Sequence, residues 1–245
     1  MKILGEWKKN PKLDYRIVLA TDPKSVAAEQ YRVLRSKLEI LRRERPFKTI
    51  AVTSAVPGEG KTMTVANLAV ATARVKGTRV VLVDADLRRP ALHRMLGQPN
   101  DRGLSQVLEG KAKPEEVTRL LGPFPDGQSG ALFFIPSGES QPNESEKLGS
   151  GEMATLISEL SSRFDLVLFD VPPILPLSDP LVMSQKVDGL LMVVRAASTP
   201  RDIVAMALEG IPREKVLGTV LNGIDERCSA HYASLYKSYR KSYGS

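Results

Sequence analysis

One short segment of the chain carries the residue types that bind phosphate: residues 55–62 read Ala-Val-Pro-Gly-Glu-Gly-Lys-Thr. Glycines let backbone N–H groups turn inward towards phosphate oxygens, and a helix N-terminus adds a favourable dipole. Residues 48–54 before the segment are rich in β-forming side chains, and residues 63–75 after it favour a helix. This strand–loop–helix context predicts a phosphate-binding loop; the alternative is a glycine-rich turn before a buried helix.

The sequence assigns a role to each residue of this loop. We expect Lys61 to reach the β- and γ-phosphates of a nucleotide and the Thr62 hydroxyl to bind Mg²⁺. Ala55 stands where the strict pattern has glycine, which is a mild departure. The other loop residues expected to contact the nucleotide are Pro57, Gly58, Glu59, Gly60 and Met63.

Three aspartates follow apolar runs elsewhere in the chain. Asp84 and Asp86 end the run Val-Leu-Val-Asp-Ala-Asp, and side chains two apart on an extended segment point the same way. Asp170 ends a second apolar run over residues 166–170, the pattern called Walker B. One of the first two carboxylates can help to hold Mg²⁺ while the other accepts a proton from an attacking hydroxyl. The alternative for all three aspartates is a capping role in turns.

Asn222 follows the last apolar run and could hydrogen-bond a nucleobase. The pattern of GTP-binding proteins would place a lysine where Gly223 stands, so guanine specificity is not supported and ATP is favoured. A plain turn at residues 221–225 is the alternative.

Four of the six tyrosines lie in the last fourteen residues, at Tyr232, Tyr236, Tyr239 and Tyr243. Their neighbours are mostly Ser, Lys, Arg and Gly, which offer few aliphatic side chains to bury, so a mobile tail is expected. Tyrosines in such a tail are candidate phosphoacceptors. The 4-3-4 spacing also fits a helical stripe, so an amphipathic helix docked on another surface is the alternative.

Alternation of β-like and helical stretches predicts a single α/β domain. Nearly continuous apolar strands fit a doubly wound, mostly parallel sheet with helices on both faces and ligands at the carboxyl ends of the strands. The expected strands are 48–54, 79–84, 131–135, 164–170, 188–195 and 216–222. The expected helices are 22–45, 62–75, 103–109, 152–162, 180–186 and 200–209.

The chain divides into three predicted parts. Residues 1–21 are expected to form an extended arm, residues 22–226 the phosphate-binding domain, and residues 227–245 the tyrosine-rich tail. The first helix is expected to start at Thr21-Asp22-Pro23, because a capping residue precedes a proline. Residues 122–149 are rich in Gly, Pro and Ser, and we expect surface loops around one strand there.

Composition excludes several classes of protein. The chain has 245 residues, a hydrophobic fraction of 42% and one cysteine, which suits one globular domain without a disulfide framework or a cysteine-based metal site. The net charge of +7 accompanies no nucleic-acid motif, so no nucleic-acid partner is expected. No apolar run approaches the roughly 18 residues of a membrane span, and no signal peptide is recognisable, so a cytoplasmic protein is expected.

The three nucleotide motifs together resemble those of the bacterial tyrosine kinases of the BY-kinase family. Residues 54–62 resemble the Walker A motif of that family, including its Pro-Gly-Glu, and residues 84–88 resemble its Walker A′ motif. Residues 170–173 resemble its Walker B motif. The resemblance covers about residues 20–245 and implies a P-loop fold with ATP and Mg²⁺ as cofactors.

Two further elements resemble the same family. Glu29, Arg32 and Arg35 match its Glu-x-x-Arg-x-x-Arg oligomerisation motif, for which intrahelical ion pairing is the alternative interpretation. The tyrosine tail resembles its autophosphorylation cluster. Residues 142–146 resemble its Pro-Asn-Pro-x-Glu loop, with Glu144 in place of a proline.

The resemblance implies specific roles for the site residues. Lys61 and the loop amides would bind phosphate, Thr62 and Asp84 would bind Mg²⁺, and Asp170 would act through water. Asp86 would be the base for a tyrosine hydroxyl. A ring-shaped homo-oligomer of the unphosphorylated protein would place each tail at its neighbour's site, and phosphorylation would add negative charge that opens the ring.

The resemblance also implies partners. Many members of the family carry the kinase fused to a membrane chain-length regulator, and this chain resembles the split type, whose separate membrane partner completes activation. We therefore expect a kinase recruited to the inner face of the plasma membrane, where it regulates polymerisation or export of capsular polysaccharide or exopolysaccharide. A tyrosine phosphatase is the expected opposing enzyme.

Two other classes of function compete with the kinase interpretation. One is an ATPase switch of the partitioning or septum-site type, whose members usually carry a second lysine early in the loop, where this chain has Val56. The other is a nucleotide-binding scaffold without catalysis, which the full set of candidate charged residues argues against.

Overall fold

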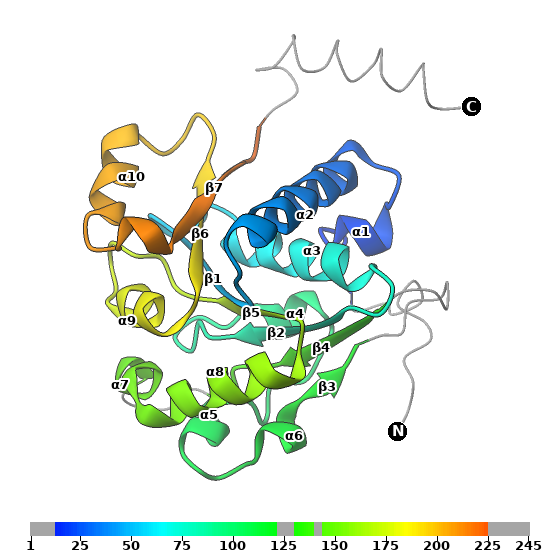
Figure 1. Ribbon diagram of the computed structural model, residues 1–245, viewed down its shortest axis with the longest axis vertical. Coiled ribbons are helices and arrows are strands. Elements are labelled where there is room, and N and C mark those ends of the chain that lie inside the picture. The colour runs from blue at the N-terminus through cyan, green and yellow to red at the C-terminus, as the bar shows by residue number, and fades with distance from the viewer. Residues whose placement is uncertain (1–12, 122–129, 140–143, 225–245) are drawn as a thin grey trace.

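The computed structural model describes residues 13–121, 130–139 and 144–224, which form one α/β unit. Its centre is a seven-stranded sheet of order β3-β4-β2-β5-β1-β6-β7 (Figure 1). All neighbouring strands are parallel except β3 and β4, which are antiparallel. The strands are β1 (Thr49–Ser54), β2 (Arg79–Asp84), β3 (Arg119–Leu120), β4 (Ala131–Ile135), β5 (Leu166–Asp170), β6 (Gly189–Arg195) and β7 (Val216–Asn222).

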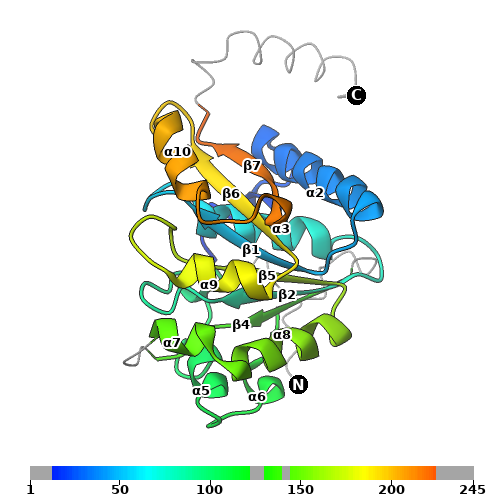
Figure 2. The ribbon, with the colours of Figure 1, turned by 60° about the vertical axis from the view of Figure 1, so that its left-hand side comes forward.

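Helices cover both faces of the sheet (Figures 1 and 2). On one face α3 lies directly on the strands and α2 packs against α3, whereas α5, α7, α8 and α9 occupy the other face. The helices are α1 (Val18–Thr21), α2 (Val26–Glu44), α3 (Lys61–Ala73), α4 (Leu92–Met95), α5 (Leu104–Leu108), α6 (Pro114–Val117), α7 (Glu144–Gly149), α8 (Gly151–Arg163), α9 (Asp179–Lys186) and α10 (Arg201–Leu208). The predicted doubly wound, mostly parallel fold is therefore confirmed.

The central strands are buried on both faces, which explains their unbroken apolar sequences. Every residue of β1 and β5 is buried. One hydrophobic cluster fills the space under α2 and α3, and a second fills the space under α5, α8 and α9. Among the described residues, no helix is both long enough and apolar enough to cross a membrane.

The segment before α2 differs from the extended arm predicted over residues 1–21. Ile17 and Leu19 are fully buried in the cluster under α2 and α3. The buried side chain of Asn67 in α3 fixes this segment, because its amide donates a hydrogen bond to the carbonyl of Arg16 at 2.9 Å. Residues 13–21 are therefore anchored to the core through Ile17, Leu19 and Ala20, and residues 1–12 lie outside the described part.

Helix α2 begins later than predicted. The Ser25 hydroxyl accepts a hydrogen bond from the backbone N–H of Ala28 at 3.2 Å, so Ser25 is the N-cap and the helix starts at Val26. Pro23, which the sequence placed in the first helical turn, lies in the preceding turn.

Sequence patterns missed only short elements. The six predicted strands are all present, and the unpredicted one is the two-residue edge strand β3. Helices α1, α4 and α6 have four residues each, too few to show a helical period. Helix α7 lies in residues 122–149, where surface loops around one strand were predicted.

Candidate active site

Three candidate functional segments meet at one edge of the sheet because their strands are parallel neighbours. The phosphate-binding loop follows β1, and Asp84 and Asp170 are the last residues of β2 and β5. Asp84 and Asp170 are register partners in the β2–β5 ladder. Two carboxylates far apart in the sequence are therefore adjacent in space, at the carboxyl edge where doubly wound sheets bind ligands.

The loop itself depends on two glycines with backbone conformations that other residues rarely adopt. Gly58 has φ +87° and Gly60 has φ +91°. A side chain at Gly60 would in addition come within 2.1 Å of the Asn222 amide nitrogen. Gly60 is the N-cap of α3, so the helix starts at Lys61 with its N-terminus facing the loop.

The Glu59 side chain supports the loop from behind. Glu59 is only 1% exposed, and its Oε2 accepts a hydrogen bond from the Val56 backbone N–H at 2.9 Å. Oε1 accepts from the Arg195 backbone at 3.1 Å and from the Thr199 hydroxyl at 2.6 Å. Glu59 thus joins the loop to the turn between β6 and α10, where Ala197 has φ +54°.

Asn222 completes the same support. Its side-chain amide donates to the Glu59 carbonyl at 2.8 Å, and its own carbonyl accepts from the Ala196 backbone at 2.8 Å. The Arg195 guanidinium donates to the Gly58 carbonyl at 3.2 Å. The end of β7 and the turn after β6 are thereby tied to the loop.

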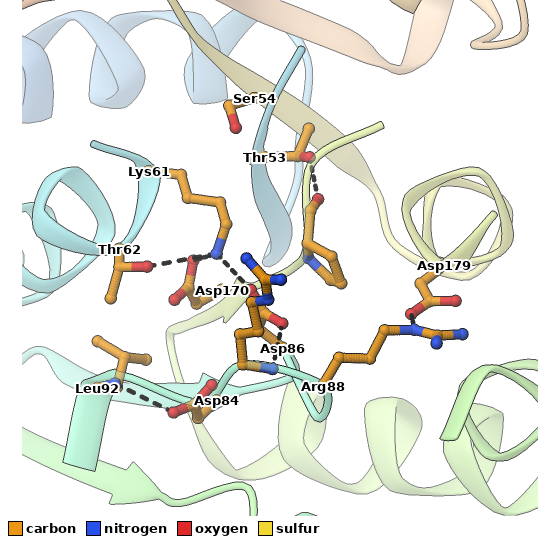
Figure 3. A network of polar contacts seen from close by, with 12 residues as sticks. Thr53, Ser54, Lys61, Thr62, Asp84, Asp86, Arg88, Leu92, Asp170 and Asp179 are labelled. Carbon is orange, nitrogen blue, oxygen red and sulfur yellow. Dashed lines mark hydrogen bonds and ion pairs between the residues drawn. The ribbon is translucent and has the colours of Figure 1, made fainter. Parts of the chain in front are cut away.

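Lys61 lies at the centre of the charged network shown in Figure 3. Its ammonium donates to Asp86 at 2.7 Å, to Asp170 at 3.2 Å and to the Thr62 hydroxyl at 3.3 Å. The Lys61 side chain is 12% exposed, so these ion pairs are largely shielded from water. Asp86 is fixed from the other side by the backbone N–H of Arg89 at 3.0 Å.

Burial perturbs the charged groups in opposite directions. Burial, together with the neighbouring Asp170 charge, raises the pKa of Asp84 well above its ordinary value. Burial also raises the pKa of Asp170, although the charge of Lys61 opposes this. Burial alone would lower the pKa of Lys61, but the charges of Asp170 and Asp86 outweigh it and raise that pKa. The site holds more buried negative charge than Lys61 offsets.

A cavity of about 830 Å³ opens over this network. Its lining includes the predicted nucleotide contacts Pro57, Gly58, Gly60, Lys61, Thr62 and Met63, and also Asp86. Asp84 and Asp170 are not part of the lining, because they are fully buried behind it. The other walls come from residues 14–16, 88–95 and 172–177; of these, only Arg88, Pro172 and Pro173 belong to motifs that the sequence identified.

The residues present fit a magnesium–nucleotide complex. One oxygen of Asp84, Oδ1, and one of Asp170, Oδ2, are buried without a hydrogen-bond partner among the described residues. No group of three acidic, histidine or cysteine residues in the described part could hold a metal by itself. Mg²⁺ in nucleotide sites is held by one or two carboxylates together with phosphates and water, so the two orphaned oxygens and the Thr62 hydroxyl suit it.

The structure therefore brings together Lys61, Thr62, Asp84, Asp86 and Asp170, as the sequence predicted. Glu59 and Asn222 do not line the cavity, and both form hydrogen bonds that stabilise the loop, so their direct contact with a nucleotide stays a prediction. The four tail tyrosines and residues 142 and 143 lie outside the described residues.

Neutralising Asp84 should stabilise the protein when no nucleotide is bound. Asp84→Asn keeps the acceptor for the Leu92 backbone N–H, which lies 3.1 Å away, and removes a buried charge. At pH 7 we expect the melting temperature to rise by about 2–4 °C, the shift that about 1 kcal/mol produces in a domain of this size.

The melting-temperature difference between Asp84→Asn and the unmodified chain should also depend on pH in a definite direction. A carboxyl whose pKa is raised on folding loses stability as pH rises from its unfolded towards its folded pKa. The melting-temperature advantage of Asp84→Asn should therefore be absent in acid and should grow as the pH rises through the raised pKa of Asp84. The exposed Asp22→Asn is the control, and a lower melting temperature for Asp84→Asn at pH 7 would contradict the prediction.

Removing the Glu59 charge should loosen the loop. Glu59→Gln places an amide N–H₂ group against backbone and hydroxyl donors, so we expect the free energy of unfolding to fall by about 1–3 kcal/mol. Urea titration followed by circular dichroism measures this change. The exposed Glu209→Gln is the matched control, and equal effects of the two substitutions would show that the buried carboxylate does not support the loop.

Known proteins share this fold and sequence. The family model of the CobQ/CobB/MinD/ParA nucleotide binding domain matches residues 50–243. Tyrosine-protein kinase YwqD of Bacillus subtilis is 36% identical over 214 residues, which cover 86% of this chain and 87% of that protein. Tyrosine-protein kinase etk of Escherichia coli K12 is 32% identical over 218 residues, which cover 88% of this chain but only 29% of etk.

Solved structures agree with these relatives. The kinase domain of Escherichia coli tyrosine kinase ETK has a TM-score of 0.78 at 30% identity, covering 87% of this chain and 82% of that one. The chimerical protein CapA2B2 has a TM-score of 0.74 at 27% identity, covering 89% and 94%. The septum-site-determining protein MinD of Pyrococcus horikoshii, complexed with Mg-ADP, reaches 0.58 at 26% identity, covering 74% and 72%. By sequence, fold and site, the chain belongs to the bacterial tyrosine kinases, the BY-kinase family of protein-tyrosine kinases.

Proposed function

We propose that the protein transfers the γ-phosphoryl group of ATP to Tyr232, Tyr236, Tyr239 or Tyr243 of another copy of the chain. The observation that carries this proposal is the Lys61–Asp86 ion pair of 2.7 Å in the wall of the cavity. It places a phosphate-binding cation beside a carboxylate that can accept a proton. Phosphoryl transfer needs mainly positioning and charge neutralisation, which these groups supply.

The loop and its helix hold the phosphates in this proposal. Backbone N–H groups at residues 58–62 and the N-terminus of α3 face the anion, and Glu59 keeps the loop in shape from behind. Thr62, Asp84 and Asp170 would hold Mg²⁺, the last through water. When bound, the metal neutralises charge on the phosphate oxygens. The two carboxylates, whose pKa values burial raises, then gain the counter-charge that they lack.

Asp86 is the proposed base. Its carboxylate is held by the Arg89 backbone and by Lys61, both within 3.0 Å. The Lys61 ammonium cannot neutralise Asp86 fully while it also binds phosphate, so phosphate binding draws its charge away from Asp86. The carboxylate is then free to accept the proton of the tyrosine hydroxyl as its oxygen attacks phosphorus.

The wider role of the kinase is proposed from its family. The kinase regulates polymerisation or export of capsular polysaccharide or exopolysaccharide, with a membrane chain-length regulator as activator and a tyrosine phosphatase as opponent. The activator recruits the cytoplasmic kinase to the inner face of the plasma membrane.

Mass spectrometry tests the catalytic proposal. The full chain incubated with Mg-ATP and a candidate activator fragment should gain phosphate on the four tail tyrosines, and Lys61→Met should gain none because phosphate is no longer held. The exposed Lys24→Met is the control for loss of a lysine. Nucleotide hydrolysis without any tail phosphate would favour the ATPase switch of the septum-site type, and phosphotyrosine in folded Lys61→Met would sink the assigned site.

We further propose that α2 mediates a ring-like self-association of the unphosphorylated protein. Arg32 pairs with Glu29 at 2.7 Å within the helix, and the Arg35 guanidinium donates to the Ala71 carbonyl of α3 at 3.2 Å. The Arg32–Glu29 pair remains partly exposed. Val33 and Ile40, two turns apart, are exposed aliphatic side chains on the same helix, which supports a contact surface there.

Sedimentation of the unphosphorylated chain tests this surface. Glu29→Ala with Arg32→Ala should convert the assembly to monomer, because both charges leave the exposed stripe while the buried face of α2 is untouched. Arg43→Ala with Glu44→Ala, also exposed on α2, is the control. An unchanged mass of the Glu29→Ala, Arg32→Ala variant would indicate that these residues form only an ion pair within α2 and no contact between subunits.

A further inference from the structure

Four arginines line the cavity in addition to Lys61. Arg16 precedes α1, Arg88 and Arg89 follow β2, and Arg94 lies on α4, so two separate stretches of the chain supply them, residue 16 and residues 88–94. Arg16 pairs with Asp14 at 2.6 Å, and Arg88 pairs with Asp179 at 3.2 Å. The guanidinium groups of Arg89 and Arg94 form no hydrogen bond or ion pair with another described residue.

The cavity lining is consequently strongly basic. It contains five cationic side chains, the four arginines and Lys61, against two carboxylates, Asp14 and Asp86. Lys61 and the loop amides already serve a nucleotide. The Arg89 backbone N–H lies 3.0 Å from the proposed base Asp86, and Arg94 lies on α4, so the surplus cations share the cavity wall with that base.

The proposed acceptor has the wrong charge for this lining. Residues 227–245 contain Arg227, Lys237, Arg240 and Lys241 and no acidic residue. A basic segment is repelled by a basic cavity. One phosphate on tyrosine adds a charge of about −1.5 to −2 and three strong acceptor oxygens, which reverses the interaction. Arginine is the side chain best suited to bind such a group through paired N–H donors.

We propose that Arg89 and Arg94 form a phosphotyrosine-binding subsite for the tail of a second copy, so that a tail with one phosphate is a better acceptor than an unmodified tail. The proposal rests on tail phosphorylation as the proposed function. Neighbouring tail tyrosines are three or four residues apart, about 10–14 Å in an extended chain. The proposal requires that a phosphotyrosine bound at the arginines leave a neighbouring tyrosine within reach of Asp86.

Peptide binding tests the subsite without depending on turnover. Fluorescence anisotropy would compare three peptides of residues 229–245 on the full chain saturated with Mg-ADP: unmodified, phosphorylated at Tyr239, or phosphorylated at Ser238. We expect the Tyr239 phosphopeptide to bind at least tenfold tighter than the unmodified peptide and tighter than the Ser238 phosphopeptide. The preference should shrink as salt rises.

Variants of the arginines assign the effect to the cavity. Arg89→Gln with Arg94→Gln should abolish the phosphotyrosine preference, whereas Arg201→Gln with Arg213→Gln, which removes two exposed arginines elsewhere, should leave it intact. Equal affinity for modified and unmodified peptides would overturn the subsite. The subsite would also be overturned if Arg89→Gln with Arg94→Gln lowered only the affinity for Mg-ADP, because the arginines would then bind the nucleotide.

A turnover assay distinguishes the proposed phosphotyrosine subsite from the proposed kinase activity. With Mg-ATP, a higher kcat/KM for the Tyr239 phosphopeptide supports the subsite, and equal values argue against it. If no peptide is phosphorylated although the phosphopeptide binds selectively, the proposed function fails while the subsite stands. If inorganic phosphate at the same concentration displaced the phosphopeptide, the arginines would be a general anion site, and the phosphotyrosine subsite would be overturned.

Discussion

Two carboxylates at the ends of neighbouring buried strands, Asp84 and Asp170, repel each other, and the rest of the site is arranged around that repulsion. The parallel register of β2 and β5 makes them adjacent, and burial raises the pKa of both. Lys61 at the start of α3 supplies only partial compensation. The nucleotide-free protein therefore holds an electrostatic imbalance that a divalent cation with its phosphates relieves, which links ligand binding directly to stability.

The shape of the phosphate-binding loop depends on contacts with distant parts of the chain as well as on its own glycines. Glu59 and Asn222 join it to the turn after β6 and to the end of β7 through buried hydrogen bonds. Such support lets a loop that must present its backbone to a ligand keep one shape without that ligand, so less ordering is needed on binding. The rigid loop fixes the geometry in which phosphate binds, and the unbalanced carboxylates favour binding of the cation that accompanies it.

Periodicity and spacing were enough to predict the parallel sheet, the loop, and the four charged residues and Thr62 that meet at the carboxyl edge of the sheet, because these depend on local sequence and on strand order. The role of Glu59 could not be predicted, since its partners Arg195 and Thr199 are more than 130 residues away. The anchoring of Ile17 and Leu19 in the core likewise depends on a distant residue, Asn67, which bonds to the Arg16 carbonyl. The arginines that line the cavity come from residue 16 and from residues 88–94, so only the tertiary structure brings them together.

The link between Asn222 and the loop fixes where the chain leaves the nucleotide site. From Asn222, ten residues lead to Tyr232 and twenty-one to Tyr243, so their greatest reaches are about 33–36 Å and about 69–76 Å. Effective concentration falls as a tether lengthens beyond the span that it must cover. The four proposed acceptor tyrosines thus differ in their contour length from Asn222, and the anchoring point at the end of β7 sets the greatest distance that each could reach.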